Sequence, residues 1–544
     1  MKTYTIGIDF GTLSGRCVLV DCSNGREIAE AVYQYPHGVM DDCLPSGKKL
    51  PPLYALQHPE DYLQVVRITV PAVLDKGGIS PEQVVGIGID FTACTILPVN
   101  KEGVPLCMLE KYVDTPHAYV KLWKHHAAQP EADELNDLAS RRDEEWLKVY
   151  GGRVSSEWAL PKILQILREA PEIYEETARF MEAADWLVSK LVGKEIHSLP
   201  FAGYKGLYHN NAYPSNDFMV ALDKGLDGIV GTKLSENIVD FSALAGVLGR
   251  EGAELTGLPE GIPVATPQID AHAAMPALQI TEAGELMLIM GTSACHIVNA
   301  KTTENVKGIC GYVQGGVIPG LTTYEAGQAA VGDIFDWFVK NCVPASYENE
   351  ANDRGISIHK LLREKAKALP AGSGGIIALD WWNGNRTPYV DGTLSGVIVG
   401  LTIGTKPEQI YRALIEATAY GTKRIIDIYE ASGIEINALY AAGGIAEKDE
   451  LLMQIYADVT GREIKLSGTA QACAYGSAVL GATNDPEYEN DVKLAATKLK
   501  KIKNVTYKPN EEDRAKYEKL YAKYVELSEY FAKGGSDVMK IIKN

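Results

Sequence analysis

Two segments of this chain, about 280 residues apart, share one pattern: a strand, a tight turn of glycine and small hydroxyl residues, and a second strand. They are Thr5–Asp21 and Glu285–Lys301. Apolar residues alternate on both sides of the first turn, which is the period of a β-strand, so each segment predicts a β-hairpin. A repeat at half the chain length suggests two domains of one design. The alternative is that such turns are common and the likeness has no such meaning.

The chain is long enough for two large domains, since it has 544 residues, of which 46% are hydrophobic. No low-complexity linker separates the halves. We place the boundary near Gly261–Pro263, which gives an N-terminal domain of residues 1–265 and a C-terminal domain of residues 266–544.

The charge balance is acidic, with 53 Lys and Arg against 71 Asp and Glu, a net charge of −18. Nucleic acids and anionic membranes both bind basic surfaces, so neither is expected as the main partner. A small phosphate ligand stays compatible, because a local cluster of backbone N–H groups can bind an anion on an acidic protein.

The nine cysteines lie far apart, are odd in number and form no CxxC pair. This pattern is typical of reduced thiols in an intracellular protein. The N-terminus has no signal-peptide core, and no apolar stretch reaches the roughly 18 residues of a membrane helix. We therefore expect a soluble, cytoplasmic protein. The pair His125–His126 shows no metal-ligand spacing and is expected to be structural.

The turn Asp9–Arg16 fits one of three phosphate-binding devices. A Walker loop needs GxxxxGK[ST], which the chain lacks, and a dinucleotide fold needs a helix where a strand follows here. The remaining device is a hairpin whose N–H groups and hydroxyls hold phosphates, while Asp9, at the strand end, faces a Mg²⁺ ion through water. A plain hairpin is the alternative.

The second hairpin supplies a similar turn, Gly291–Thr292–Ser293, with Met290 expected where Asp9 stood. One turn with an acid and one without would suit a single Mg-ATP. A third element, Ala441–Gly444, follows a short strand and precedes a helix from about Lys448. Paired glycines let backbone lie against a flat base, although an ordinary strand-to-helix turn is equally open.

One long helix is expected in the second half. Thr405 and Glu408 form a capping-box pattern, and apolar residues follow at three- and four-residue steps as far as Ile428.

With these motifs in place, the chain resembles the FGGY carbohydrate kinases over nearly its whole length. Nine blocks carry the resemblance in order: DFGTLSGR, KLPPLYALQHPEDYL, GIGIDFTAC, LWKHHA, GYKGLYH, IDAHA, MGTSACH, YEAGQAAVGDIFDWF and ALDWWNGNRTP. The last block is most similar to the family members that act on ribulose; other members tend to have Glu at the position of Asn385. Tyr112–Pro116 departs from the W-x-D-x-R of glycerol and xylulose kinases, which argues against glycerol.

The resemblance implies an α/β fold of two ribonuclease H-like domains, of the actin-like ATPase type, around a central catalytic cleft. It implies ATP and Mg²⁺ as cofactors and phosphorylation of L-ribulose, and also of other ribuloses, at O5 in L-arabinose catabolism. The N-terminal domain would bind the sugar and contain the first phosphate hairpin. The C-terminal domain would bind ATP and hold the catalytic Asp270.

The site residues follow from the resemblance position by position. Asp270 would be the catalytic base, and Asp9 would hold Mg²⁺ through water. The sugar would contact Ala93, Trp123, Lys205, Asp270 and Glu325. ATP would contact Gly11, Thr12, Ser14, Arg16, Gly291, Thr292, Gln328, Gly443, Gly444 and Lys448.

The predicted sugar-pocket residues have structural alternatives. Asp270 could form a turn, and Trp123 could be a core residue. Lys205 could be a solvated loop lysine, and Glu325 could cap a helix starting near Gly327.

Two other functions stay open: another FGGY sugar kinase such as a xylulose kinase, and an actin-like or chaperone-type ATPase without a sugar pocket. The preferred pentulose and its hand are open, and a homodimer is a hypothesis.

Overall fold

The computed structural model describes residues 2–241 and 244–541, which form two compact units. Each unit is described by itself. Unit 1 comprises residues 1–281, 312–323 and 471–501, and unit 2 comprises residues 282–311, 324–470 and 502–544.

The main sheet of unit 1 has the order β3-β2-β1-β5-β10-β9, with β11 also paired to β5. Strand β1 runs antiparallel to β2 and parallel to β5, which confirms the predicted first hairpin. A second sheet has the order β4-β7-β6-β8. The strands are β1 (Tyr4–Phe10), β2 (Ser14–Asp21), β3 (Glu27–Gln34), β4 (Leu56–Gln57), β5 (Val84–Phe91), β6 (Ile96–Val99), β7 (Val120–Lys121), β8 (Arg179–Glu182), β9 (Leu244–Val247), β10 (Pro263–Ala265), β11 (Gln268–Ile269) and β14 (Gly311–Gln314).

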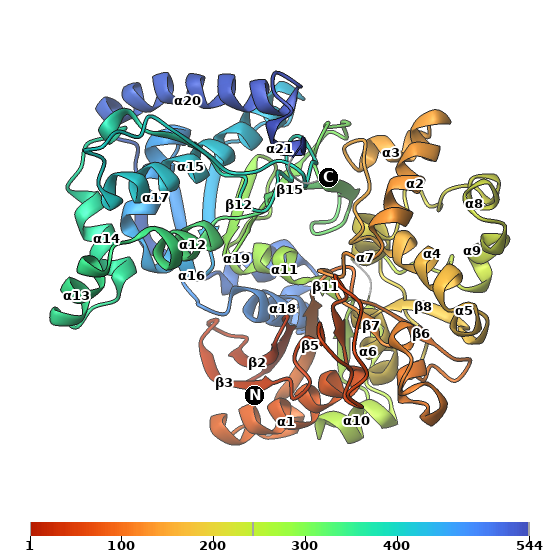
Figure 1. Ribbon diagram of the computed structural model, residues 1–544. Helices are drawn as coiled ribbons and strands as arrows, with labels where there is room; N and C mark the ends of the chain where they lie inside the picture. Colours follow the sequence, from red (N-terminus) through yellow and green to blue (C-terminus); the bar gives the residue numbers. More distant parts are fainter. Residues whose placement is uncertain (1, 242–243, 542–544) are drawn as a thin grey trace. The chain divides into compact units, whose positions relative to one another are not determined.

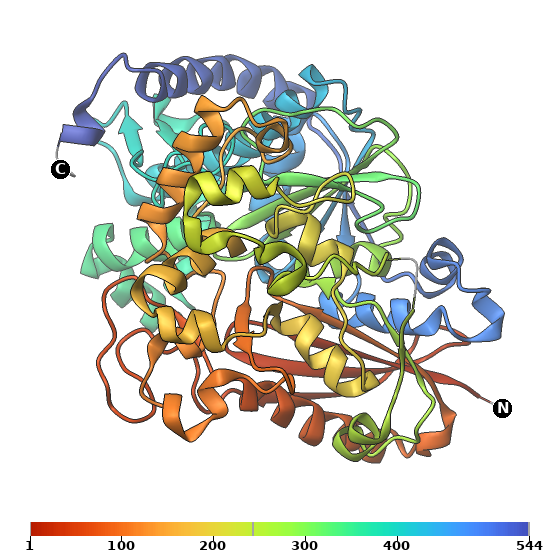
Figure 2. The same cartoon turned by 90° about the vertical axis from the view of Figure 1, so that its right-hand side faces the viewer.

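Helices cover both faces of the main sheet, and Figure 1 shows α1 and α18 on opposite sides of it. Helices α2 to α9, in orange to yellow-green, face the viewer in Figure 2. The helices of unit 1 are α1 (Pro59–Gly77), α2 (Gln129–Arg141), α3 (Glu145–Val149), α4 (Ala159–Glu169), α5 (Pro171–Glu176), α6 (Ala183–Val192), α7 (Leu199–Lys205), α8 (Asn216–Leu222), α9 (Ile229–Thr232), α10 (Arg250–Thr256), α11 (Asp270–Ala277), α18 (Ala472–Ala482) and α19 (Val492–Leu499).

Strand glycines let helix α18 lie directly on the backbone of β1 and β5. A Cβ atom added at Gly7 would lie 1.9 Å from the carbonyl oxygen of Ala474, and one at Gly88 would lie 1.8 Å from that of Ser477. Glycine inside a strand often marks such a close approach of another backbone. The opposite face carries the apolar residues that pack against α1, such as Ile6 and Ile8.

We expect Gly88→Ala to destabilise unit 1 by about 1–3 kcal/mol or more, because the added methyl group meets fixed backbone rather than a movable side chain. Thermal and urea unfolding followed by circular dichroism measure the change. The control is Gly392→Ala, since an added Cβ there has no neighbour within 4 Å. Equal stability of the two variants would contradict the packing argument.

The sheet of unit 2 repeats the pattern of unit 1, because β12 runs antiparallel to β13 and parallel to β18. Its order is β15-β13-β12-β18-β19-β20, and a separate two-stranded sheet pairs β16 with β17. The second predicted hairpin is therefore confirmed. The strands are β12 (Glu285–Met290), β13 (Ala294–Ala300), β15 (Thr322–Gln328), β16 (Ile377–Leu379), β17 (Val397–Val399), β18 (Ala438–Ala442), β19 (Ile464–Ser467) and β20 (Ile502–Tyr507).

The predicted long helix of unit 2 is α15, but its N-terminus differs from the expectation. It begins at Pro407, and the side chain of Gln409 accepts a hydrogen bond from the Lys406 N–H (2.9 Å). Glu408 instead accepts one from the Tyr347 hydroxyl. The helices of unit 2 are α12 (Gly332–Cys342), α13 (Ala345–Asp353), α14 (Ile358–Lys367), α15 (Pro407–Ala431), α16 (Gly444–Lys448), α17 (Glu450–Thr460), α20 (Glu511–Ala532) and α21 (Val538–Ile541).

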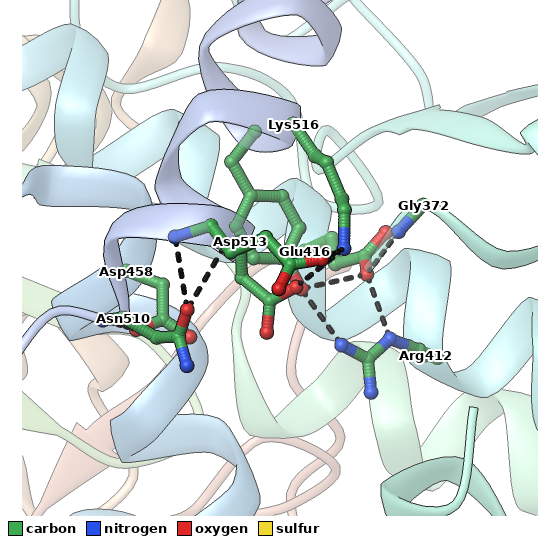
Figure 3. Close-up of polar contacts among 9 residues, drawn as sticks. Gly372, Arg412, Glu416, Asp458, Asn510, Asp513 and Lys516 are labelled. Carbon is green, nitrogen blue, oxygen red and sulfur yellow. Dashed lines mark hydrogen bonds and ion pairs between the residues drawn. The ribbon is translucent and has the colours of Figure 1, made fainter. Parts of the chain in front are cut away.

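A buried polar network attaches helix α20 to α15 (Figure 3). The Arg412 Nε donates to Glu416 Oε1 (2.9 Å), which also accepts from the Gly372 N–H (3.1 Å). The hydroxyl of Tyr517, on α20, contacts both charged groups. At the start of α20, the Asn510 N–H donates to Asp458 Oδ1 (2.7 Å). Buried charges are tolerated because each is paired and hydrogen-bonded.

The two units do not follow the chain order expected from the sequence. Residues 266–281, 312–323 and 471–501 fall within the expected C-terminal domain, whereas in the structure they belong to unit 1. The reason is that α11 and α18 pack against each other, and α18 packs on β1 and β5. In residues 2–241 and 244–541, no helix is both long and apolar enough to cross a membrane.

Candidate active site

Three parallel strands of unit 1 end level with one another and bring acidic side chains together. In the register, Asp9 of β1 lies opposite Asp90 of β5, and Asp90 lies opposite Gln268 of β11. Asp270 follows one residue beyond the pair formed by Ile269 and Phe91. The carboxyl ends of parallel strands meet at one edge of a sheet, which is where ligands bind in open α/β sheets.

The side chains of Asp9 and Asp90 lie on neighbouring strands, and both are buried. Burial raises the pKa of Asp9, and the Arg16 guanidinium, whose Nε lies 3.2 Å from Asp9 Oδ2, opposes that rise. Burial and the Asp9 charge raise the pKa of Asp90 well above its ordinary value. Two adjacent carboxylates do not both ionise readily. We assign the proton to Asp90, which leaves Asp9 as the carboxylate beside Arg16.

The surroundings of Asp90 agree with a retained proton. Its Oδ2 accepts a hydrogen bond from the Ser477 hydroxyl (2.6 Å). Its Oδ1 is buried and has no donor among the described residues. A proton shared with Asp9 satisfies this oxygen. Sequence reasoning did not single out Asp90, although the triplet GID occurs at both Gly7–Asp9 and Gly88–Asp90.

We expect Asp90→Asn to raise the stability of the protein at pH 7–8 by about 1–3 kcal/mol. The reason is that burial keeps the Asp90 carboxyl protonated in the folded protein, whereas the same carboxyl ionises freely in the unfolded chain. A folded-state pKa raised above the ordinary 3.8 makes the wild type lose stability as pH rises above that value. The advantage of the variant should therefore vanish below about pH 4. Thermal unfolding across this pH range, with EDTA and without nucleotide, measures it. A constant advantage at all pH values would contradict the assignment.

The first hairpin turn is held by neighbouring side chains. The Gly11 N–H donates to the Ser14 carbonyl (3.0 Å). The Gln57 amide donates to the Thr12 carbonyl (2.8 Å), and the Trp123 indole donates to the Thr12 hydroxyl (3.2 Å). Trp123 and Thr12 are thus brought together, although they lie 111 residues apart in the chain.

Arg16 spans the base of the same turn. Its guanidinium donates to the Ser14 hydroxyl (3.3 Å) and to Gln471 Oε1 (3.2 Å), in addition to its ion pair with Asp9. These contacts place Asp9, Ser14 and Arg16 in one cluster. The cluster can bind an anion through Arg16 and a hydrated cation through Asp9.

The predicted sugar-contacting residues of unit 1 lie at the ends of elements. Ala93 follows β5, and Cys94 after it has φ of +56°, in the left-handed region. Lys205 is the last residue of α7, and its Nζ lies 4.5 Å from the ring centroid of Trp158. Lys205 is therefore buried rather than a solvated loop lysine.

Asp270 is the first residue of α11 and is half-buried. Its Oδ1 accepts a hydrogen bond from the Ala271 N–H (2.6 Å), which fixes the carboxylate at the helix start. Its charge acts on Asp90 and on the thiol of the half-buried Cys473. These three groups therefore share one electrostatic environment.

In unit 2, the second turn lies beside the paired glycines. The Gly291 N–H donates to the Ser293 carbonyl (2.9 Å). Gly443 has φ of +97°, and a Cβ there would lie 2.4 Å from the Met290 carbonyl oxygen, so only glycine fits. The turn residues Gly291 and Thr292, as well as Gly444, are exposed.

Two expectations for the glycine turns of unit 2 are adjusted. Since Gly291 corresponds to Gly11, Ile289 rather than Met290 stands where Asp9 stood; the turn still lacks an acid. The helix expected from about Lys448 is α17, which begins at Glu450, but a short helix, α16, precedes it from Gly444 and ends at the exposed Lys448.

Glu325 and Gln328 lie within strand β15 and are buried, and the helix after them begins at Gly332 rather than near Gly327. The Gln328 amide donates to Asp380 Oδ2 (2.7 Å) and to the Thr418 carbonyl (2.9 Å), and accepts from the Thr422 hydroxyl (2.8 Å). These bonds use both of its N–H donors. Any effect of Gln328 on ATP binding would therefore come from its holding strand β15 in place, and not from donating a hydrogen bond to the nucleotide.

Among the described residues, no group of three or more His, Cys, Asp and Glu side chains is arranged to hold a metal ion. His125 is buried and bonded to Gln165 Oε1 (2.9 Å), as a structural histidine. A single carboxylate such as Asp9 is nevertheless compatible with Mg²⁺, which keeps several waters and is often bound through substrate phosphates.

Comparison with known proteins identifies the family. A model of the N-terminal domain of the FGGY family of carbohydrate kinases matches residues 4–276, and a model of the C-terminal domain matches residues 286–484. This chain belongs to the FGGY family of carbohydrate kinases. A curated relative named Ribulokinase, from Halalkalibacterium halodurans, is 50% identical over 99% of this chain and 97% of its own length. Another Ribulokinase, from Geobacillus thermodenitrificans, is 49% identical over 100% and 97%.

Solved structures share the fold of this FGGY kinase at low sequence identity. A xylulose kinase from Rhodospirillum rubrum has a TM-score of 0.78 at 21% identity, covering 96% of this chain and 98% of that one. A Plasmodium falciparum glycerol kinase with ADP has a TM-score of 0.73 at 18% identity, covering 97% and 98%. The fold is the two-domain α/β fold of the sugar kinases, of the actin-like ATPase type.

Proposed function

We propose that this FGGY kinase is a ribulokinase, which transfers the γ-phosphoryl group of ATP to O5 of L-ribulose in arabinose catabolism. The observation that carries the proposal is the full-length identity of 46–51% to six curated proteins named Ribulokinase. The level strand ends of unit 1 support the proposal, because Asp270 follows the pair of Ile269 and Phe91 at the end where Asp90 lies.

Asp270 acts as the general base in this proposal. A sugar hydroxyl is a poor nucleophile, and its proton must leave as the phosphoryl group arrives. Asp270 is half-buried, and the Ala271 N–H holds one of its oxygens, so the carboxylate has a fixed orientation at the helix start. Lys205, packed over Trp158, would supply donors for a polyol, and the Trp123 indole N–H would do so in exchange for its bond to the Thr12 hydroxyl. Glu325 would serve from unit 2.

The nucleotide would be held by backbone N–H groups and side chains of the two hairpin turns. Arg16 carries a positive charge beside Ser14 and can approach a phosphate oxygen. Gly11 and Thr12 belong to the same turn, and Gly291 and Thr292 form the exposed turn of unit 2. Gly443, Gly444 and Lys448 would line the adenine and ribose end.

Asp9 is the residue that would hold a Mg²⁺ ion, through water. The ionised carboxylate assigned to Asp9, with Asp90 protonated, fits a hydrated divalent cation. When bound, Mg²⁺ neutralises charge on the phosphates during transfer. Phosphoryl transfer depends mostly on positioning and on such charge stabilisation, which the residues of both units would share.

The test is a comparison of ADP release with L-ribulose, D-ribulose, D-xylulose, ribitol and glycerol. We expect kcat/KM for a ribulose to exceed that for xylulose and glycerol by at least about tenfold, because a buried site that bonds one set of hydroxyls leaves groups unpaired with another. Preference for D-xylulose would support the xylulose kinase instead. ATP turnover without dependence on sugar would favour an actin-like or chaperone-type ATPase.

A cytoplasmic location and a homodimer complete the proposal as predictions. All nine cysteines are free thiols in the structure, as a reducing compartment requires. Sedimentation of the purified chain measures the oligomeric state.

A further inference from the structure

Lys162 of helix α4 is a fully buried lysine that neither the turn chemistry nor the proposed mechanism uses. Its ammonium group donates to the backbone carbonyl oxygens of Cys94 (2.5 Å), Leu122 (2.9 Å) and Lys121 (3.4 Å). A lysine ammonium has three N–H donors, and here all three point to backbone. Burying such a cation is unfavourable unless its bonds are satisfied, so this arrangement is specific.

Glu182, at the end of β8, holds the next residue of the same loop. Its Oε2 accepts a hydrogen bond from the Thr95 N–H (2.9 Å). Burial raises the pKa of Glu182 to about 8, and the Lys162 charge opposes that rise, so the two groups interact. Lys162 thus holds the carbonyl of Cys94, and Glu182 holds the N–H of Thr95.

The loop between them needs this support. Cys94 has φ of +56°, a conformation that residues with a Cβ atom rarely adopt and that persists only where the surroundings enforce it. A second brace within the loop is the contact between the Thr92 and Thr95 hydroxyls (2.8 Å). The conformation of the loop that contains Ala93 therefore depends on groups that lie outside it.

The three carbonyls belong to two separate segments that carry predicted sugar contacts. Cys94 follows Ala93, and Leu122 precedes Trp123, whose indole also reaches the Thr12 hydroxyl. A single cation therefore ties the loop after β5 to the segment after β7. Movement of either segment would change the spacing between Ala93 and Trp123.

We infer that Lys162, braced by Glu182, is a positioning residue that sets the spacing of Ala93 and Trp123 and thereby the affinity for the sugar, but not for ATP. The inference rests on the proposed function for the roles of Ala93 and Trp123. Lys162 itself does not touch the substrate in this account. It acts through the backbone that it holds.

The first variant is Lys162→Met, which keeps a long side chain and removes the ammonium. We expect KM for L-ribulose to rise about tenfold or more, since displacement of a contact by about 1 Å is enough for a large loss, while KM for ATP stays within about twofold. Calorimetric titration of the sugar without ATP should show the same loss of affinity.

Lys162→Met removes the positive charge that acts on the buried carboxyl of Glu182, so a second variant separates positioning from stability. Lys162→Met/Glu182→Gln removes both ionisable groups and keeps an acceptor for the Thr95 N–H. Glu182 also lines a cavity of about 50 Å³, which gives the replacement room. Replacing both members of a buried pair is often tolerated, so we expect near-normal thermal unfolding with the sugar KM still raised.

The matched control is Lys233→Met. Lys233 is a partly buried lysine of the same unit that also donates to a backbone carbonyl, that of Thr177, and it lies over the Tyr174 ring. We expect its sugar KM to equal that of the wild type.

Four results would overturn the inference: a wild-type sugar KM in the double variant, an equal rise in both KM values, the same rise in Lys233→Met, or a double variant that does not fold. If the wild type prefers another sugar to ribulose, the proposed function fails. The variants are then compared with that sugar, so the two failures remain distinct.

Discussion

Asp270→Asn should lower kcat by about 10²–10⁴-fold, which is the usual contribution of a positioned general base. Asparagine has nearly the same shape and can still accept the Ala271 N–H bond that orients the side chain. It cannot accept the proton of the sugar hydroxyl. The fold and the binding of sugar and nucleotide should therefore persist while turnover is lost, as steady-state kinetics and calorimetric titration with L-ribulose would measure.

A matched control for this variant is Asp75→Asn, an exposed carboxylate on helix α1 of the same unit. Its kcat should equal that of the wild type. A loss of less than about tenfold in Asp270→Asn would show that another group accepts the proton. Loss of sugar binding in that variant would instead assign Asp270 to binding rather than to catalysis.

Asp9→Asn should raise the Mg²⁺ concentration needed for half-maximal activity by about 10–100-fold, the usual effect of removing a residue that acts on a metal through an intervening group. The physical reason is that the amide lacks the negative charge that Asp9 keeps beside Arg16. Titration of activity with Mg²⁺ at fixed ATP measures the shift. High Mg²⁺ should restore part of the rate, because the charge alone is missing.

Asp61→Asn is the control, since Asp61 is a similarly buried carboxylate of unit 1 that is paired with His37 Nδ1 (2.7 Å). Its Mg²⁺ dependence should match that of the wild type. If Asp9→Asn loses activity without any change in its Mg²⁺ dependence, Asp9 acts through Arg16 and the hairpin rather than through a metal ion.

Local patterns predicted much of the fold. The two hairpins, strand β5 and helix α15 are all found as expected, because side-chain periods of 2 and 3.6 residues are visible in single segments. Element ends were less accurate. The side chain that accepts the N–H bond at the start of α15 is Gln409 rather than Glu408. Sequence patterns do not locate a helix end to within one residue.

The candidate site was predicted in parts. Thr12 and Trp123 are hydrogen-bonded, and Asp9 and Asp270 lie at the ends of β1 and β11, the two strands that both pair with β5. Asp90 and Lys162 were missed for different reasons. The GID triplet at Asp90 repeats that of Asp9 and was available in the sequence, whereas Lys162 lies in an apolar helical run whose pattern does not show which carbonyls it would reach.

The order of residues by itself determined the paired hairpins and the kinase family, since both rest on short motifs whose chemistry is local. Only the tertiary structure decided that α18, from late in the chain, lies on β1 and β5 and that its Ser477 reaches Asp90. It also decided that the amide of Gln328 is used within unit 2. A glycine in a strand shows that another backbone can approach closely, and a buried polar group shows that it needs a hydrogen-bond partner. Neither shows which segment of the chain provides the backbone or the partner, because that depends on contacts between residues far apart in the chain.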